Sequence, residues 1–348
     1  MEYNGKYKLF DSRKIITYPL LERINKVKLE DLIKVESTKS SLYDIDDSTA
    51  VNIDNIALDI VNAYTLNKPV IVFSGAHLVK NGLGPLLVDL IDRKLITLFA
   101  GNAASAIHDF ELALIGETSE YVPEALEKGQ FGMAYEFAYI NVALKYGNLL
   151  KLGYGESLGK MICDPAFSEK VINEVSRCDS PKEFKHQEVS ILAACYRNNI
   201  PYTIHAGIGT DVIDQHPSFD GEAKGGCSGR DFLIYTNETT KLKNGGVILN
   251  IGSAVTGPEV LLKAISMAAN IGSFPKGIIT ADFDLRNFYH EQMKDETSQN
   301  YYFRDQKSVV TRIPEAFGGK GYYIKGNQLN TVPFLYKMII KHFNNKIM

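Results

Sequence analysis

The chain has 348 residues, of which 45% are hydrophobic, and a formal net charge of -3, so it can bury a large core and disorder of the whole chain is not expected. Its dispersed charges offer no basic face for nucleic acid and no polybasic tract for a membrane, so we expect a small molecule or further copies of the chain as partners. The sequence shows no secretory leader and no apolar run near the roughly 18 residues that span a bilayer, which predicts a cytoplasmic protein. Its four cysteines lack CxxC spacing, so we expect neither disulfides nor a zinc knuckle.

The first 65 residues are more polar than the rest and form an N-terminal extension, in which residues 37–42 are typical of a loop and residues 55–63 of a helix. From residue 66 to residue 335, short apolar runs rich in β-forming residues alternate with helical patterns. The runs lack polar alternation, which is typical of strands covered on both faces. They occupy residues 69–73, 95–100, 200–204, 247–251 and 278–281.

This alternation predicts an α/β fold, with one domain over residues 1–348 built on a Rossmann-like, doubly wound and mostly parallel sheet. Between residues 112 and 185 the pattern is wholly helical, so we expect a helical insertion in this core. Residues 336–348 are expected to form the end of a C-terminal helix. No linker rich in proline, glycine or serine divides the chain, and it has no internal repeat.

Small and polar residues follow each apolar run. Because ligands bind at the carboxyl ends of the strands in such a sheet, these residues predict an extended ligand such as a dinucleotide. Turns between a strand and a helix need glycine in any case, but that need explains neither the histidines nor the aspartates. The five segments are Ser74-Gly75-Ala76-His77, Gly101-Asn102-Ala103, residues 205–211 (HAGIGTD), residues 252–259 (GSAVTGPE) and Asp282-Phe283-Asp284.

The segment from residue 95 to residue 111 is the most informative of these strand ends. Its apolar run leads into Gly101-Asn102-Ala103, and a helical pattern with His108, Asp109 and Glu111 follows at once. Free N–H groups at a helix N-terminus suit a phosphate, and the three side chains add groups that handle protons. The alternative is that the small residues only permit tight packing of helix on strand, with His108 an ordinary polar residue.

Four further residues at the strand ends are candidates for a site. His77 and His205 are candidate proton carriers, although either is also consistent with a structural histidine. Asp211 and Asp214 follow a short glycine-rich loop, where they can accept hydrogen bonds from hydroxyls or pair with a cationic amine.

The remaining polar segments are less specific. Lys80 and Lys224 are expected to be solvated, although Lys80 lies close enough to a strand end to reach a phosphate. Residues 218–231 are polar and glycine-rich, which is typical either of a mobile active-site loop or of a passive surface loop. Cys227 lies among them, but the sequence places no histidine beside it, so a nucleophilic role is not expected. Spacings such as HExxH are absent, and no metal site is expected.

In their order and spacing, five blocks of the chain resemble deoxyhypusine synthase from about residue 70 to about residue 334. They are SGAHLVKNG (74–82), FAGNAASAIHDFE (99–111), IPYTIHAGIGTDVID (200–214), VILNIGSAV (247–255) and IITADF (278–283). The second block is also similar to one in the archaeal-type, NAD-dependent ornithine cyclodeaminases, and both families begin by removing hydride from a carbon that bears an amine. The resemblance implies a sheet that binds NAD, a homotetramer, and cofactor contacts at Ala76, His77, Asn102, Ala103, Asp211, Gly252, Thr280 and Ala281.

The chain departs from deoxyhypusine synthase at the transfer step. That family carries a lysine in a Trp-Gly-Lys segment, where it forms the imine that accepts the aminobutyl group. This chain has no tryptophan, and its matching segment offers Arg312, which stays protonated and cannot form a Schiff base. The family's paired histidines are also missing, and residues 256–259 stand in their place. Authentic deoxyhypusine synthesis is therefore not expected.

The sequence thus predicts an NAD-dependent enzyme that acts on a small amine or amino acid by hydride abstraction and imine chemistry, either deamination or aminoalkyl transfer. Two alternatives remain: a nucleotide-binding or sensor protein without turnover, and a transferase that uses Cys227 as nucleophile. Oxidation next to nitrogen needs a base and a carboxylate that holds the cationic substrate. We assign the base to His108 or His205, a second base to Glu259, the carboxylates to Asp211 and Asp214, and the bidentate binding of a substrate carboxylate to Arg312.

Overall fold

Six parallel strands form the main sheet of the computed structural model, which describes residues 3–347. Side by side they are β5 (Tyr202–Ile204), β3 (Leu98–Gly101), β2 (Val70–Ser74), β6 (Val247–Ile251), β7 (Ile279–Asp284) and β8 (Lys320–Lys325). Numbered along the chain, the sheet has the order 3-2-1-4-5-6, which is that of the doubly wound dinucleotide-binding fold. The prediction of a Rossmann-like α/β fold is confirmed. Residues 1, 2 and 348, at the ends of the predicted extension and C-terminal helix, lie outside the described residues.

The central strands are buried on both faces, as the unbroken apolar runs predict. All five residues of β2 are buried. Val70 and Val72 belong to one core cluster, and Ile71 and Phe73 belong to a second cluster on the opposite face. Because successive side chains of a strand point to opposite faces, a run without polar residues requires cover on both sides.

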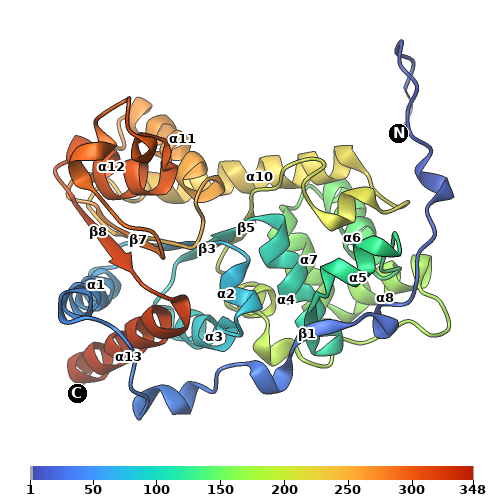
Figure 1. Cartoon of the computed structure of the whole chain (residues 1–348), viewed down its shortest axis with the longest axis horizontal. Coiled ribbons are helices and arrows are strands. Elements are labelled where there is room, and N and C mark those ends of the chain that lie inside the picture. Colours follow the sequence, from blue (N-terminus) through green and yellow to red (C-terminus); the bar gives the residue numbers. More distant parts are fainter. Residues whose placement is uncertain (1–2, 348) are drawn as a thin grey trace.

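Helices provide this cover on each face of the sheet (Figure 1). On one face α1 (Asp47–Thr65) packs against α13 (Gln328–Ile347), and on the other α10 (Gly221–Thr240) packs against α11 (Thr256–Asn270). The remaining helices are α2 (His77–Lys80), α3 (Gly84–Asp92), α4 (Ala103–Ile115), α5 (Val122–Glu127), α6 (Phe137–Leu149), α7 (Tyr154–Cys163), α8 (Pro165–Val175), α9 (Ile191–Asn198) and α12 (Ile313–Ala316).

The first helix is longer than residues 55–63, over which the sequence predicts it. Its N-terminus is fixed by Asp46, whose carboxylate accepts a hydrogen bond of 2.9 Å from the backbone N–H of Thr49. Its C-terminus follows from Asn67, which has a left-handed φ of 50°. Residues 47–65 therefore form part of the layer that covers the sheet, and only the residues before them resemble an extension.

A second, two-stranded sheet joins the N-terminal segment to the middle of the chain. β1 (Asn25–Lys28) pairs antiparallel with β4 (Glu117–Glu120). The prediction that residues 112–185 are wholly helical is therefore wrong at β4. The reason is Gly116, which ends α4 with a φ of 71° and turns the chain directly into the strand. This pairing brings the N-terminal segment alongside α4.

Residues 218–231, for which the sequence predicts a loop, instead form the start of α10 and the turn before it. The Asp220 carboxylate begins the helix by accepting hydrogen bonds of 2.9 and 3.1 Å from backbone N–H groups of the first turn. Ala223, Cys227 and Asp231 recur every four residues and are buried together on one face. Burial of this stripe outweighs the propensity cost of the glycines, about 1 kcal/mol each.

The last two strands differ from the prediction in extent. β7 continues to Asp284, beyond the predicted run at residues 278–281. β8 is a sixth strand that the apolar runs do not reveal, because it lies at the sheet edge and buries mainly Tyr322 and Ile324. Edge strands alternate between buried and exposed residues and give a weaker sequence signal.

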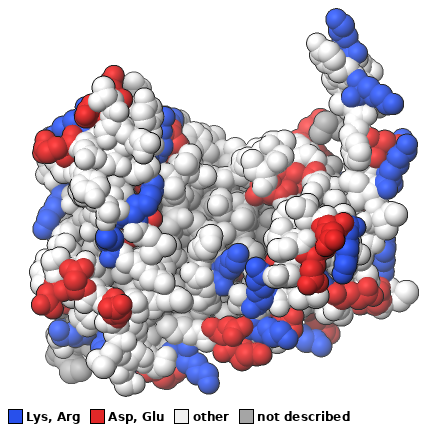
Figure 2. Space-filling view, in the orientation of Figure 1, with Lys and Arg blue, Asp and Glu red and all other residues white. Residues whose placement is uncertain are grey.

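The surface agrees with the dispersed charge of the sequence. Basic and acidic side chains are interspersed over the face shown in Figure 2. Within residues 3–347, no helix is both long enough and apolar enough to cross a membrane.

Candidate functional site

The strand order reverses between β2 and β6, and the backbone is closely packed at the carboxyl ends of these two strands. The Gly75 N–H donates a hydrogen bond of 2.9 Å to the Ile251 carbonyl. A Cβ atom at Gly75 would lie 2.1 Å from the Gly252 carbonyl oxygen, so glycine is required there. Within the described residues the buried Ser74 hydroxyl has no hydrogen-bond partner. Ligands bind at this position in doubly wound sheets.

A cleft of about 850 Å³ opens beside this point, at the carboxyl ends of β3 and β5. Its walls are the turn into α4, the loop after β5, the start of α10 and the first turn of α11. The volume lies within the range of roughly 300–1,000 Å³ that is usual for ligand and cofactor sites. The predicted site residues in its lining are Asn102, Ala103, His205, Asp211 and Glu259.

A smaller cavity of about 210 Å³ adjoins the cleft. His108 on α4 lines it, together with residues of the N-terminal segment and of β4. Ala104, Thr210 and Asp211 line both the cleft and the smaller cavity. The structure therefore places His108 and His205 in adjoining spaces that meet at Asp211.

The N-terminus of α4 separates the polar residues that the sequence groups together. Asn102 caps the helix, because its side-chain oxygen accepts a hydrogen bond of 2.9 Å from the Ser105 backbone N–H. Asp109 faces the interior and accepts hydrogen bonds from the Ser190 hydroxyl at 2.6 Å and the Ile191 N–H at 2.8 Å. Burial raises the pKa of Asp109 to about 6. Asp109 thus caps α9, and His108 faces the smaller cavity.

A chain of hydrogen bonds fixes the tautomer of His108. The ionised Glu111 carboxylate only accepts hydrogen bonds, so the Thr118 hydroxyl donates to Glu111 Oε2 over 2.5 Å. The same hydroxyl lies 2.7 Å from His108 Nδ1 and must accept from it. In the neutral imidazole, Nδ1 therefore carries the hydrogen and Nε2 carries the free lone pair. This is the form that a general base requires.

Arg23 anchors the buried end of this chain of hydrogen bonds. Its Nη1 lies 2.7 Å from Glu111 Oε1, and both side chains are 3% exposed. Burial alone would raise the pKa of Glu111, but the charge and hydrogen bond of Arg23, together with the neighbouring His108, outweigh it and lower this pKa to about 2. The sequence gives no sign of Arg23 as a site residue. Arg23 and Glu111 are far apart in the chain, and the pairing of β1 with β4 brings them together.

His205 has a very different environment. It is 8% exposed, stacks on the ring of Phe73 and meets Tyr235 edge to face. Its Nε2 lies 3.1 Å from the Thr203 hydroxyl. Burial lowers the pKa of His205 to about 3, and no acidic side chain offsets this effect in the part of the chain that the structure describes. The ring is therefore neutral near pH 7 and costly to protonate.

Asp211 and Asp214 surround a buried lysine. Lys224 is 1% exposed, so the expectation of a solvated side chain is wrong. Its ammonium donates to the Gly207 carbonyl, to Asp211 at 2.7 Å and to Asp214 at 2.5 Å, which uses all three of its hydrogens. Burial raises the pKa of Asp211, and Lys224 opposes part of this rise. Two carboxylates thus face one ammonium, and of the two Asp211 lies at the junction of the two cavities.

Glu259 lies on the first turn of α11 and lines the large cleft. Its carboxylate pairs with Lys263 and lies 3.6 Å from Arg304. The hydrogen bond from Lys263 is the main reason for its lowered pKa. The structure thus presents Glu259 as an ion-paired carboxylate in the lining of the cleft.

Arg312 does not line either cavity. It lies exposed at the end of a π-helical segment (Gln306–Arg312), with Nη2 3.4 Å from the Tyr301 hydroxyl. The same segment carries Lys307, which is 2% exposed and has its Nζ 3.2 Å from the centroid of the Tyr301 ring. Burial lowers the pKa of Lys307. The segment therefore contains a lysine after all, although it does not line the cleft either.

Five residues expected at the cofactor from the resemblance lie outside the lining of the cleft. Ala76 and His77 follow β2 directly, beside the switch in strand order. Gly252 follows β6 with a φ of 64°. The other two, Thr280 and Ala281, lie inside β7 and are fully buried. The strand continues past them, so their side chains are covered by the sheet's own packing.

The carboxyl end of β7 carries a cluster of acidic residues that the sequence does not predict. Carboxylate oxygens of Asp282, Asp284 and Asp305 lie within 4.8 Å of one another. Arg286 pairs with Asp284 and Asp305 and balances part of this charge. Burial, and then the neighbouring Asp305 charge, raise the pKa of Asp282. The cluster arises because a later segment folds back on β7.

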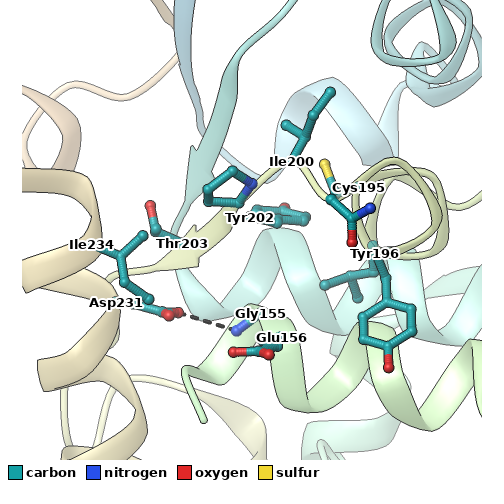
Figure 3. Close-up of a pocket in the computed structure, with 12 residues that line it drawn as sticks. Gly155, Glu156, Cys195, Tyr196, Ile200, Tyr202, Thr203, Asp231 and Ile234 are labelled. Carbon is teal, nitrogen blue, oxygen red and sulfur yellow. Dashed lines mark hydrogen bonds between the residues drawn. The ribbon is translucent and has the colours of Figure 1, made fainter. Parts of the chain in front are cut away.

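A third cavity, of about 430 Å³, lies at the outer edge of β5 and contains no predicted site residue. Asp231 closes this edge by accepting a hydrogen bond of 3.0 Å from the Gly155 N–H (Figure 3) and another of 2.7 Å from the Ile204 N–H. Burial raises the pKa of Asp231 to about 7. On the same helix, Cys227 is fully buried and burial raises the pKa of its thiol. This environment does not favour a nucleophilic thiolate.

No protein-family model matches the chain, and no curated protein matches it. Among solved structures, it is similar to ArgZ, an arginine dihydrolase from the ornithine-ammonia cycle in cyanobacteria, with 15% identity, a TM-score of 0.45 and coverage of 88% of this chain and 33% of ArgZ. It is also similar to a "conserved putative LOR/SDH protein" from Methanococcus maripaludis S2, with 16% identity, a TM-score of 0.47 and coverage of 89% of this chain and 74% of that protein. A third similar structure is a "putative deoxyhypusine synthase" from Entamoeba histolytica, with 9% identity, a TM-score of 0.41 and coverage of 91% of this chain and 97% of that protein. The chain spans about a third of ArgZ, and similarities this low carry no argument about its activity.

Proposed function

We propose that this chain is an NAD-dependent enzyme that removes hydride from the nitrogen-bearing carbon of a small amine or amino acid and then processes the imine, by deamination or aminoalkyl transfer. One observation carries the proposal. A cleft of cofactor size meets, at Asp211, a second cavity lined by a histidine whose hydrogen bonds leave Nε2 free to act as a base.

The residues at the switch in strand order fit a dinucleotide. The Ser74 hydroxyl is buried without a partner in the described chain, and Gly75 brings the backbone close to the carboxyl ends of the strands. The residues that would hold the cofactor are these two and, in the cleft, Asn102 and Ala103. Bound NAD supplies the acceptor for the hydride and its two electrons.

The chain's own residues then have separate tasks. Asp211 and Asp214 attract the cationic amine with the negative charge that Lys224 leaves uncompensated. His108 Nε2 takes the proton from the substrate nitrogen, which frees the lone pair that forms the C=N bond as the hydride leaves. Glu111 stabilises the imidazolium that results, through Thr118. Glu259, which also lines the cleft, is the second candidate base.

Calorimetry with the whole chain tests the first half of this proposal. We expect NAD⁺ to bind, and no binding of either NAD⁺ or NADP⁺ would contradict the proposal. Because the imine chemistry can return the hydride, reduced cofactor need not accumulate. A stopped-flow experiment at stoichiometric NAD⁺ with ornithine, putrescine or spermidine should therefore show transient absorbance of reduced nicotinamide. Binding without reduction by any of the three would instead favour the nucleotide-binding protein without turnover.

A further inference from the structure

Three carboxylates line the smaller cavity: Asp211 lies where the cavity joins the cleft, and the other two, Glu111 and Glu120, have both oxygens engaged. Glu111 receives hydrogen bonds from Arg23 on one oxygen and from Thr118 on the other. Glu120 accepts 2.8 Å from the Tyr18 hydroxyl on Oε1 and 2.9 Å from the Gly132 N–H on Oε2. Neither residue therefore needs a cationic ligand, although both line the cavity.

The basic side chains in the same lining are only partly engaged. Arg23 uses Nη1 for Glu111 and donates from Nε to the Asn25 side chain over 2.8 Å, but its buried Nη2 has no partner within residues 3–347. Lys80 forms no salt bridge in that range and is only partly exposed. Away from Asp211, the unused charged groups of this lining are thus cations. A part of a cavity with spare charged donors and occupied acceptors favours an anion.

We propose that this cavity binds the carboxylate of the substrate through Arg23 and Lys80, so that the substrate is an α-amino acid rather than a polyamine. This inference rests on the proposed function and adds the substrate class to it. Carboxylate and amine are separated by a single carbon in an α-amino acid. The smaller cavity, of about 210 Å³, is lined by Arg23 and Lys80 and also by Asp211, where it joins the cleft.

The position of His108 agrees with this orientation. His108 lines the carboxylate cavity with Arg23 and Lys80, so an amino acid held there presents its nitrogen near Nε2. The α-carbon then faces the cleft in which the cofactor is proposed to lie. Arg312, the only carboxylate-binding residue that the sequence suggests, lines neither space.

Matched ligand pairs test the inference directly. L-Ornithine and putrescine, like L-lysine and cadaverine, differ only in the carboxylate. By calorimetry on the whole chain, with and without NAD⁺, we expect each amino acid to bind about 10- to 100-fold more tightly than its amine, as a charge-assisted pair predicts. Equal binding of the two members of both pairs would overturn the inference.

Two variants locate the preference. Lys80→Met should reduce affinity for L-ornithine about tenfold, the low end of that range, and leave putrescine and NAD⁺ affinity unchanged. Arg23→Lys keeps a charge against Glu111 but removes Nη2, and it should weaken the same preference in a protein whose circular dichroism is unchanged. Loss of NAD⁺ or inorganic phosphate binding in Lys80→Met, with ornithine affinity intact, would make this a phosphate site and contradict the inference. Failure of NAD⁺ to bind while ornithine is still preferred would contradict the proposed function alone.

Discussion

The chain holds two histidines in adjoining cavities, and their surroundings make them chemically opposite. His108 is partly exposed, and the Thr118 hydroxyl joins its Nδ1 to the Glu111 carboxylate, which Arg23 holds in place. His205 is packed among aromatic rings, and burial lowers its pKa to about 3. The difference shows that two histidines near strand ends can have very different surroundings. Burial and neighbouring groups, rather than position after a strand, set the acid–base behaviour of a histidine.

Replacing His108 tests the contrast between the two histidines most strongly. His108→Gln should lower turnover roughly 100- to 10,000-fold, because a positioned general base contributes about that much. Stopped-flow reduction of bound NAD⁺ by ornithine measures the effect. His290→Gln is the matched control, since His290 is exposed and, among the described residues, forms ion pairs with Glu291 and Glu315 alone. Unchanged turnover in His108→Gln would remove His108 from the mechanism.

Within the chain of hydrogen bonds from His108 through Thr118 to Glu111, replacing Glu111 should have the largest effect on stability. Glu111→Gln leaves the buried Arg23 charge without its carboxylate, which costs roughly 3–5 kcal/mol of unfolding free energy. Urea denaturation measures the loss. Glu174→Gln, which breaks the more exposed pair with Lys145, should cost about 1 kcal/mol or less. Similar losses in both variants would mean that Arg23 and Glu111 are not a buried pair in solution.

The two threonines offer a matched test of the same contrast. Thr118→Val removes the group that orients His108, and it should reduce turnover up to roughly 100-fold, as misplacement of a catalytic group does. Thr203→Val removes the equivalent contact of His205 and should change turnover little. If Thr203→Val is the more damaging of the two, the assignment of the base to His108 is wrong.

The smallest effect concerns pH and stability. His205 has a folded pKa of about 3, below its ordinary value of about 6.5, so the unfolded state binds more protons between these values. Its contribution is present above pH 6.5 and is lost as the pH falls, by roughly 2 kcal/mol between pH 7 and pH 5. Between pH 7 and pH 5, the unfolding free energy of His205→Gln, measured by urea denaturation, should therefore fall by roughly 2 kcal/mol less than that of the wild type.

The other buried groups do not obscure this pH test. His216, with a pKa lowered to about 4 by burial, acts with the same sign. Asp109, with a pKa raised to about 6, acts with the opposite sign. Both remain in the variant, so the difference between the two proteins isolates His205. Equal pH dependence in wild type and variant would contradict a buried, neutral His205.

The sequence reveals the parts of the fold whose signal is local. Apolar runs mark β2, β3, β5, β6 and the start of β7, because sheet faces covered on both sides admit few polar residues. The start of α10 is missed, because its glycines suggest a loop and only tertiary packing makes it helical. β4 is missed because its partner β1 lies in a distant segment.

The candidate site divides along the same line. The cleft gathers Asn102, Ala103, His205 and Asp211, which follow successive strands and could be grouped from the strand order alone. The sequence alone does not reveal two buried ion pairs, because a buried cation is predictable only once its partner is placed. These are the pairs of Arg23 with Glu111 and of Lys224 with Asp211. The roles of these residues, the cofactor and the homotetramer stay predictions.

A crystal structure with NAD⁺ and L-ornithine bound tests the central claim most directly. The account predicts density for the cofactor in the large cleft, the amino-acid nitrogen beside His108 Nε2 and Asp211, and the carboxylate on Arg23 and Lys80. It would be contradicted by a cofactor bound elsewhere, such as the cavity at the edge of β5, or by an amino acid that lies against His205 and leaves the smaller cavity to solvent.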